Sequence, residues 1–239
     1  MNIKQIALLY LLCSAFITTA TAQKYKFEIG TEGGLVYTKY KIKDPQKNLQ
    51  NVPCQSGIGG INFRINTQKQ KWFYEIAFLA MEYTDGLKLK QQNSWFTSNS
   101  DAVIMFSLRA GYNFKLDKNF SIIPLIGLAP VIKTLNQDGG EGYYEEGNSS
   151  FNSLYHYTRI EIDKNIFMLL QGGIGIEYRF AKKLKFSAAF NYYQGFTNNA
   201  IYDINYQINT DPVQTANMYG KGTFVNYQAG LKFLFCRQK

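Results

Sequence analysis

The feature that most constrains the fold is an alternation of apolar with polar or small residues, repeated along most of this 239-residue chain. Side chains alternate between opposite faces of a strand, so a period of two indicates strands with two chemically different faces. Each alternating segment is about ten residues long or slightly longer, and helical spacing is absent from almost all of them. The chain is therefore predicted to be all-β.

We expect eight strands. The clearest places Ile104 and Leu108 on one face and Arg109 on the other. The fifth is apolar on both faces and contains Pro124 and Pro130, which cannot donate a ladder hydrogen bond, so it is expected to carry a bulge. The expected strands cover residues 25–38, 57–66, 72–84, 102–116, 120–134, 166–180, 184–197 and 222–235.

The connections between these strands alternate in length. Short turns are expected at 67–71, 117–119 and 181–183, and long polar loops at 40–56, 85–101, 135–165 and 198–221. Outer-membrane barrels have short periplasmic turns and long extracellular loops, whereas a soluble sandwich has no reason to sort them. This predicts a single closed eight-stranded antiparallel transmembrane β-barrel with both termini in the periplasm.

The first residues have the plan of a secretory signal peptide. Lys4 precedes an apolar run over 6–17, and Ala20-Thr21-Ala22 forms an A-x-A cleavage site. We expect cleavage of residues 1–22, with residues 23–239 forming the barrel domain. No later stretch reaches the roughly 18 apolar residues of a spanning helix. Leu12 before Cys13 is too large for a lipoprotein site, which disfavours lipid anchoring.

Charge and cysteine content argue against a nucleic-acid-binding protein and against a disulfide-stapled secreted domain. The formal net charge is +9 and the pI is about 9.3, but the Lys and Arg residues are scattered, which favours contact with anionic lipid headgroups over nucleic acid. Beyond the signal peptide only Cys54 and Cys236 remain, far apart in sequence, so a disulfide framework is not expected.

The apolar face of a membrane barrel contacts lipid, and aromatic residues near the strand ends, such as Tyr37, Trp72 and Tyr178, suit the membrane interfaces. The other face carries nearly balanced charges, which are expected to pair across a narrow lumen and plug it. These charges are Glu28, Glu32, Glu75 and Glu177 against Arg64, Arg109, Arg179, Lys185 and Lys232.

The C-terminal segment carries a family resemblance. Gln228, Gly230, Phe233 and Phe235 resemble the polar-x-Gly-x-x-aromatic-x-aromatic signal read by barrel-assembly machinery, although the chain continues to Lys239. With the signal peptide and the alternating strands, this resembles the PorT-like and OmpX-like outer-membrane β-barrel domain families over the whole mature chain. The PorT-like resemblance implies a subunit of an envelope or secretion assembly.

The sequence identifies no catalytic, cofactor-binding or metal-binding residues. The single histidine, His156, has Ser153, Glu161 and Asp163 near it in sequence, but it is read as a loop residue. The glycine clusters at 57–60 and 172–175 lack the features of phosphate-binding loops and are assigned to the barrel wall. The acidic stretch at 138–146 lacks calcium-ligand spacing and is read as a solvated loop.

Three functions remain. The first is a non-enzymatic outer-membrane barrel with a structural, adhesion or envelope-assembly role, whose long loops contact partner proteins. The third loop is the main candidate for this contact because it is rich in aromatic residues, which suit contact surfaces. These are Tyr143, Tyr144, Phe151, Tyr155 and Tyr157. The alternatives are a barrel enzyme acting on lipid or peptide at the outer rim, and a narrow pore. No cofactor is expected, and the oligomeric state stays open.

Overall fold

The computed structural model describes residues 26–53, 55–67, 71–90, 95–134, 139–145, 152–161, 166–198, 200–208 and 211–235. These residues form one antiparallel sheet of thirteen strands. The strands are β1 (Lys26–Lys43), β2 (Leu49–Asn51), β3 (Gln55–Asn66), β4 (Trp72–Leu89), β5 (Trp95–Tyr112), β6 (Phe114–Lys115), β7 (Phe120–Lys133), β8 (Gly139–Glu145), β9 (Asn152–Glu161), β10 (Ile166–Arg179), β11 (Leu184–Gly195), β12 (Ala200–Ile208) and β13 (Gln214–Phe235).

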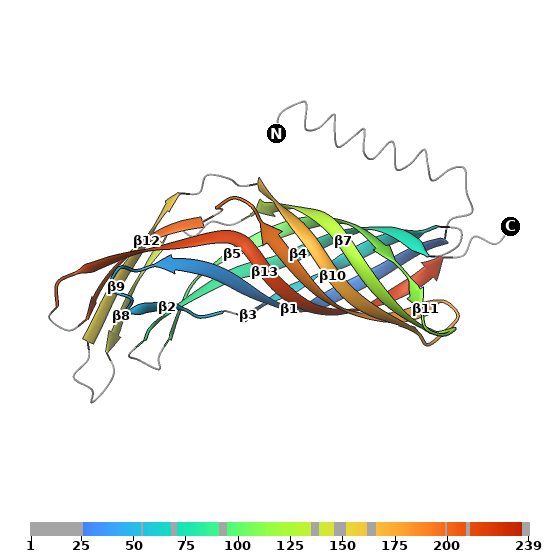
Figure 1. Cartoon of the computed structure of the whole chain (residues 1–239), viewed down its shortest axis with the longest axis horizontal. Helices are drawn as coiled ribbons and strands as arrows, with labels where there is room; N and C mark the ends of the chain where they lie inside the picture. The colour runs from blue at the N-terminus through green and yellow to red at the C-terminus, as the bar shows by residue number, and fades with distance from the viewer. Residues whose placement is uncertain are drawn as a thin grey trace, which may run out of the picture.

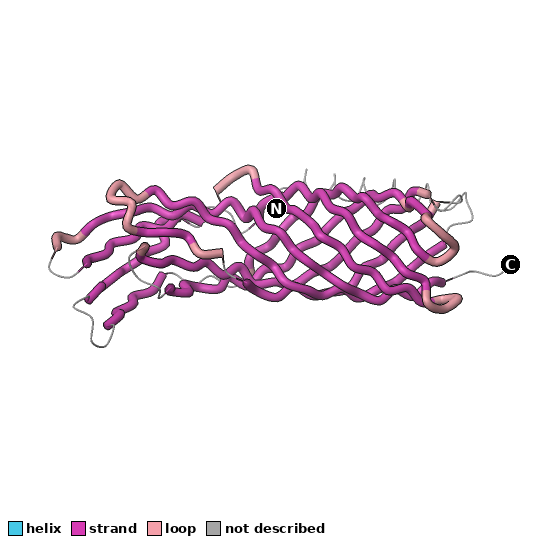
Figure 2. Tube along the Cα trace, turned by 60° about the horizontal axis from the view of Figure 1, so that its bottom comes forward, coloured by secondary structure: helices cyan, strands magenta, loops and turns pink. Residues whose placement is uncertain are grey.

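Eight of these strands close into a ring. Their order is β1-β3-β4-β5-β7-β10-β11-β13, and β13 pairs back onto β1 from Phe27↔Phe235 onward. The strands tilt around a closed tube that occupies one end of the elongated molecule (Figures 1 and 2). The predicted closed eight-stranded antiparallel barrel is confirmed, and closure leaves these strands without a free edge inside the wall.

The barrel has its apolar face on the outside. Along β10, exposed and buried residues alternate, with Ile174 54% exposed and Glu177 only 4% exposed. On β13, Tyr227 is 55% exposed while its neighbour Asn226 is fully buried. In water this arrangement would expose the apolar residues, whereas in lipid it places them against hydrocarbon. The alternation in the sequence therefore assigned the two faces correctly.

The expected short turns are present at one end of the barrel. In the turn after β6, the Asp117 carboxylate accepts hydrogen bonds from the backbone N–H groups of Asn119 (2.6 Å) and Phe120 (2.7 Å). Between β10 and β11, Ala181 and Leu184 exchange backbone hydrogen bonds of 3.3 and 3.4 Å. Short turns lie on the periplasmic side of outer-membrane barrels, which orients the molecule.

The expected bulge in the fifth strand is wrong. β7 pairs with β10 in constant register from Phe120 to Ile132, and its register with β5 is also constant. The β5–β7 ladder is instead interrupted at Pro130 and again next to Pro124, while the β10 ladder passes both prolines. The N–H groups that the two prolines lack would therefore face β5. As a result, only the β5–β7 ladder loses hydrogen bonds, and the β7–β10 ladder stays continuous.

The expectation of four long polar loops is also incorrect for most of their length. The barrel strands β1, β4, β5 and β13 continue beyond the wall, and β2, β8, β9 and β12 lie within the segments predicted as loops. β12 pairs with β13, β9 with β12, and β8 with β9, while β2 pairs with β4. We call these paired segments the extracellular extension, which forms the other end of the molecule (Figure 1).

A bulge in β13 redirects the chain from the barrel into the extension. Thr38 pairs with Phe224 and Tyr40 with Gly220, so one residue of β1 opposes three of β13. Gly222 in this bulge has φ = 68°, a conformation that L side chains rarely adopt. Nearby, a Cβ on Gly195 would lie 1.6 Å from the Lys221 carbonyl oxygen, so β11 and β13 touch through their backbones. Beyond this point β13 exchanges β11 for β12 as its partner.

Several sequence expectations lie outside the described residues. These are the signal peptide at residues 1–22 with its cleavage site, Cys54, and the segment from Cys236 to Lys239. Within the part of the chain that the structure covers, no helix is long and apolar enough to cross a membrane.

Candidate functional site

The lumen near the short turns is filled by paired charges. Arg109 on β5 donates from Nη2 to Glu32 Oε1 (2.7 Å) and from Nη1 to Glu32 Oε2 and Glu75 Oε1 (both 2.9 Å). Arg64 on β3 donates from Nε to Glu75 Oε2 (2.8 Å) and from Nη1 to Glu177 Oε1 (2.5 Å). Since β3 and β10 are not neighbours in the ring, the Arg64–Glu177 pair spans the lumen.

Two lysines complete this cluster. Lys232 Nζ contacts Glu75 Oε2 (2.9 Å) and Glu177 Oε1 (3.1 Å), and Lys185 Nζ contacts Glu28 Oε1 (2.6 Å) and Glu177 Oε2 (3.2 Å). We call the resulting group of four carboxylates and four cations the ionic network. Its members are Glu28, Glu32, Glu75, Glu177, Arg64, Arg109, Lys185 and Lys232.

The ionic network is neutral and buried. Each of its eight residues is at most 8% exposed, so unpaired charges there would be costly. The pairing of these charges across the lumen was predicted from sequence. Among the described residues, Arg179 does not join it and lies at the periplasmic opening instead.

Phe73 explains how Arg64 is held. Its ring lies 3.7 Å from the guanidinium carbon of Arg64, a cation–π contact. The ring occupies the space over Gly111, where an added Cβ would lie 2.2 Å from Phe73 Cζ. An aromatic side chain thus replaces water on one face of this buried cation.

A chain of amides and a hydroxyl group extends from the network into the lumen. Ser107 donates to Gln171 Oε1 (2.5 Å), Gln171 to Asn191 (3.0 Å), Asn191 to Asn226 (2.9 Å) and Asn226 to Gln228 (3.2 Å). Gln228 then donates to Glu32 Oε2 (3.1 Å). These residues come from β5, β10, β11 and β13, so the hydrogen bonds fix the spacing of half the ring.

Above the amides, toward the extension, the lumen is apolar. We call this cluster the apolar layer. Tyr193 and Phe224 stack within it at 4.3 Å between ring centroids and an interplanar angle of 17°. Its buried members are Val36, Ile58, Ala77, Leu79, Met81, Val103, Met105, Ala129, Val131, Phe167, Leu169, Tyr193 and Phe224. Sequence reasoning missed this layer, because inward-facing Leu79 and Met81 only blurred the expected contrast between the faces of β4.

The ionic network and the apolar layer leave little space inside the barrel. A cavity between Glu32, Arg109 and Gln228 has a volume of only about 30 Å³, which is room for one or two waters. An eight-stranded barrel has an interior just wide enough for its own side chains. The lumen is therefore packed by the ionic network on the periplasmic side of the amide chain and by the apolar layer on its other side.

The extracellular extension has a hydrophobic core of its own. Tyr202, Ile204, Tyr206 and Ile208 alternate along β12 and are each at most 6% exposed. They cluster with residues of β2, β4 and β13, and Tyr40 and Ile42 of β1 pack against them. The other core members are Leu49, Leu87, Ala216 and Met218. The extension is thus a folded layer with an interior.

The turn between β1 and β2 closes over this core. Asp44 Oδ1 accepts hydrogen bonds from the Tyr206 hydroxyl (2.9 Å) and the Gln46 backbone N–H (3.1 Å), and Asp44 Oδ2 accepts one from the Leu49 N–H (2.8 Å). Burial, reinforced by Asp44, raises the pKa of Tyr206 to about 12. Lys47 in the turn has φ = 58°. One carboxylate therefore ties this turn to β12.

The sequence of β12 carries the alternation that is typical of a strand. Between residues 201 and 208, Asp203, Asn205 and Gln207 alternate with the buried residues of the strand. This is the same period of two that identified the barrel strands. It lies inside a segment interpreted as a polar loop.

The structure describes three of the four residues grouped around His156 in the sequence, and only their backbone is placed. The backbone of Ser153, His156 and Glu161 lies in β9, where His156 pairs with Asn205 of β12 and with Glu141 of β8. The loop expected around His156 is therefore a strand hairpin. Asp163 lies outside the described residues, so no catalytic grouping is built from these four.

The glycine clusters lie in strands, but for two different reasons. A Cβ on Gly60 would lie 1.9 Å from the Phe78 carbonyl oxygen, and one on Gly173 would lie 2.2 Å from Asn191 Oδ1. Crowding inside the barrel explains these two. At Gly57 and Gly172 a Cβ would meet nothing within 4 Å, so crowding does not explain them. The assignment to the barrel wall holds, while its proposed cause applies only to the inward-facing glycines.

The comparisons with known proteins agree with this geometry. A family model described as an outer membrane protein beta-barrel domain matches residues 8–233. The chain belongs to this family. As a member of the outer membrane protein β-barrel domain family, it resides in the cell outer membrane. A search of curated proteins found no match.

The chain is similar to several solved outer-membrane proteins. The outer membrane protein OprG from Pseudomonas aeruginosa is similar with a TM-score of 0.56 and 14% identity, covering 90% of this chain and 98% of OprG. A major outer membrane protein from Thermus thermophilus has a TM-score of 0.47 and 11% identity, covering 88% and 99%. Neisserial surface protein A has a TM-score of 0.43 and 11% identity, covering 87% and 97%. Of these three structures, only OprG has a TM-score above 0.5, so only that comparison bears on the fold.

Proposed function

We propose that this outer-membrane barrel is a non-enzymatic, non-conducting scaffold that presents the extracellular extension to a partner protein. The observation that carries the proposal is the contrast between its two ends. The lumen is packed by the ionic network and the apolar layer, while the strands outside the membrane fold around a second core. A rigid scaffold that carries an ordered outer layer suits binding.

Structural, adhesion and assembly roles all use such a surface. The sequence resemblance to PorT-like proteins favours an envelope or secretion assembly among these roles. The outward positions of β1 and β12 offer mixed chemistry, with exposed Lys41 and Lys43 beside partly exposed Asp203 and Asn205. Lys43 also lies 5.2 Å from the centre of the Tyr219 ring. Such polar and aromatic mixtures are common at protein–protein interfaces.

Site-specific photocrosslinking in living cells tests the proposal. A crosslinking residue at Lys43 or Asn205 is expected to capture envelope proteins, whereas one at Ala229 on the lipid-facing wall is expected to capture none. Adducts of equal yield at all three positions, or at Ala229 alone, contradict a partner surface on the extension. Deletion of residues 135–165 then asks whether the captured set depends on the β8–β9 hairpin.

Two further measurements address the alternatives. Because the lumen is packed, the purified barrel is expected to show no single-channel conductance in planar bilayers, and steady unitary currents would favour the pore. The enzyme alternative rests on His156. A hydrolytic or transfer activity that is lost in His156→Ala would favour that alternative over the scaffold.

A further inference from the structure

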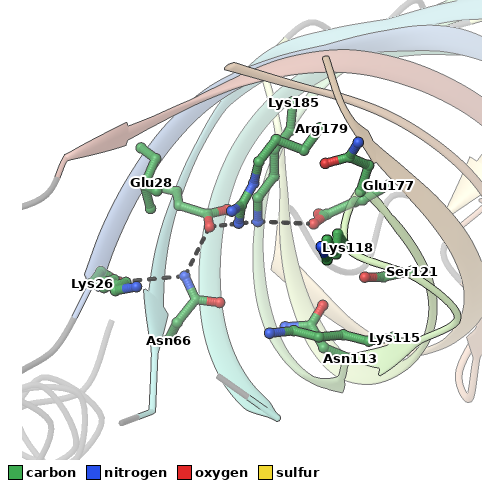
Figure 3. A pocket seen from close by; sticks show the side chains of 12 residues that line it. Lys26, Glu28, Asn66, Asn113, Lys115, Lys118, Ser121, Glu177, Arg179 and Lys185 are labelled. Atoms are coloured by element: carbon green, nitrogen blue, oxygen red, sulfur yellow. Dashed lines mark hydrogen bonds and ion pairs between the residues drawn. The ribbon is translucent and has the colours of Figure 1, made fainter. Parts of the chain in front are cut away.

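The periplasmic end of the barrel opens into a small concave site. We call it the periplasmic mouth and define it by Lys26, Lys115, Lys118, Ser121 and Arg179, which line one pocket. These side chains come from the start of β1, from β6 and the turn after it, from the start of β7 and from the end of β10 (Figure 3). Glu28, Glu177 and Lys185 of the ionic network form its inner wall.

The inner wall contributes no spare charge. Glu28 and Glu177 are both bound by Lys185, and Glu177 is also bound by Arg64 and Lys232. The excess of positive charge in the mouth therefore comes from Lys26, Lys115, Lys118 and Arg179. Within the described part of the chain none of these four forms an ion pair.

Asp117, the neighbour of Lys118 in sequence, builds the turn at the rim. The Asp117 carboxylate accepts the backbone N–H groups of Asn119 and Phe120, which builds the turn. The Arg179 N–H donates to the Asn119 carbonyl (2.8 Å), so this turn is tied to the end of β10. Lys118 is thereby held beside the opening, as Figure 3 shows.

The lining supplies hydrogen-bond donors that match an oxyanion. Lysine ammonium groups and the arginine guanidinium only donate, and the Ser121 hydroxyl and the amide of Asn119 add further donors. The Asn66 amide also lines the pocket, but it already donates to the Lys26 carbonyl and to Glu28 Oε1. A phosphomonoester carries a charge of about −1.5 to −2 and three strong acceptor oxygens, so it can accept hydrogen bonds from several of these cations at once.

From this arrangement we propose that the periplasmic mouth is a binding site for a phosphate group. The site faces the periplasm and is separated from the extracellular extension by the packed lumen, so it is independent of the scaffold function proposed above. The phosphate comes either from a soluble periplasmic molecule or from the headgroup of an inner-leaflet phospholipid. Both sources offer unesterified phosphate oxygens to the same donors: a free phosphate or phosphomonoester offers three or more, and a phospholipid phosphodiester offers two.

The test compares two variants that each remove three charges. Lys26→Gln/Lys118→Gln/Arg179→Gln removes three of the four cations to which the excess charge of the mouth is assigned, and Lys71→Gln/Lys182→Gln/Lys183→Gln removes exposed charges from the same rim. Inorganic phosphate is titrated into the full-length barrel in maltoside micelles and followed by calorimetry, with folding checked by heat-dependent gel migration. Saturable binding is expected for the wild type, at least ten-fold weaker binding for the mouth variant, and less than two-fold change for the rim variant.

A second arm identifies the source. In nanodiscs of phosphatidylglycerol, a headgroup ligand occupies the mouth and abolishes binding of added phosphate, whereas discs of an uncharged galactolipid leave it intact. A soluble ligand gives equal binding in both discs. Equal weakening in the mouth and rim variants would overturn the proposal, as would the absence of saturable phosphate binding by the wild type in micelles and galactolipid discs.

Discussion

Arg109 and Glu32 meet in the middle of the barrel through two parallel contacts of 2.7 and 2.9 Å, although they stand on strands that are not neighbours in the ring. Glu32 Oε2 also accepts hydrogen bonds from Asn62 (3.2 Å) and Gln228 (3.1 Å). Two-point arginine–carboxylate pairs fix direction as well as distance. One carboxylate thus joins β1, β3, β5 and β13.

Glu177 is the most informative position for testing the ionic network, because it contacts Arg64, Lys185 and Lys232. Glu177→Gln leaves four buried cations facing three carboxylates. Removing one partner of a buried ion pair typically costs about 3–5 kcal/mol. We expect the urea midpoint of unfolding to fall accordingly.

Glu82→Gln provides the matched control, since Glu82 is an exposed residue on the outer face of the same wall. The double variant Glu177→Gln/Lys185→Gln restores neutrality and is expected to recover part of the lost stability. Equal urea midpoints for Glu177→Gln and Glu82→Gln would mean that the network does not stabilise the barrel.

Gly33 and Gly34 form a natural pair of test and control on β1. A Cβ on Gly34 would lie 1.9 Å from the Tyr227 carbonyl oxygen, while one on Gly33 would approach nothing closer than 3.5 Å. Overpacking a wall costs on the order of 1–3 kcal/mol or more. Gly34→Ala is expected to lower the folded fraction on unboiled gels, and Gly33→Ala to leave it unchanged. The reverse order would show that the register of β1 is wrong.

Pro130→Ala tests the interruption in the β5–β7 ladder. The new N–H at position 130 faces β5 opposite Phe106, where the ladder is broken. Hydrogen exchange is expected to show a protected amide at residue 130 in a barrel that remains folded. In contrast, Ala129→Pro removes an N–H on the β10 side of the strand, where the ladder is continuous, and is expected to destabilise the barrel. Rapid exchange at residue 130 would refute this orientation of β7.

Tyr206 gives the extension a dependence on alkaline pH. Its pKa is raised to about 12, against about 10 in an unfolded chain. The unfolded chain therefore loses this proton first, so the contribution of Tyr206 to stability is full below about pH 10 and is lost as the pH rises toward 12. Subtracting the 295 nm titration of Tyr206→Phe from that of the wild type should isolate one phenol with a midpoint near 12. A midpoint near 10 would contradict burial beside Asp44.

The barrel wall was predictable because each strand has two different environments. The charged inward residues, such as Glu28, Arg109 and Lys232, alternate with apolar lipid-facing ones, so period and polarity agreed. The apolar layer was hidden for the same reason. Where lumen and lipid are both apolar, as at Leu79 or Val131, alternation of polarity vanishes and the inward residues cannot be distinguished.

The extension was missed because local polarity misled the interpretation. Segments rich in Asn, Asp and Gln read as loops, yet Tyr202 and Ile204 pack against residues that are distant in sequence, such as Leu49 and Leu87. Partners of this kind cannot be read from one segment. The charges of the periplasmic mouth were visible individually, but only ring closure brings Lys26, Lys118 and Arg179 to one opening.

The pairing of Arg64 with Glu177 has a consequence for how the chain reaches its native state. An open sheet of the first strands already aligns Arg64 with Glu75, because β3 and β4 are neighbours. The partner on β10 arrives only when the ring closes, as does the Lys185 contact with Glu28 from β11 to β1. Until then these side chains keep their hydration. We therefore expect ring closure to be the step that buries these charges, and the charged inner face of an open sheet to disfavour its burial in lipid.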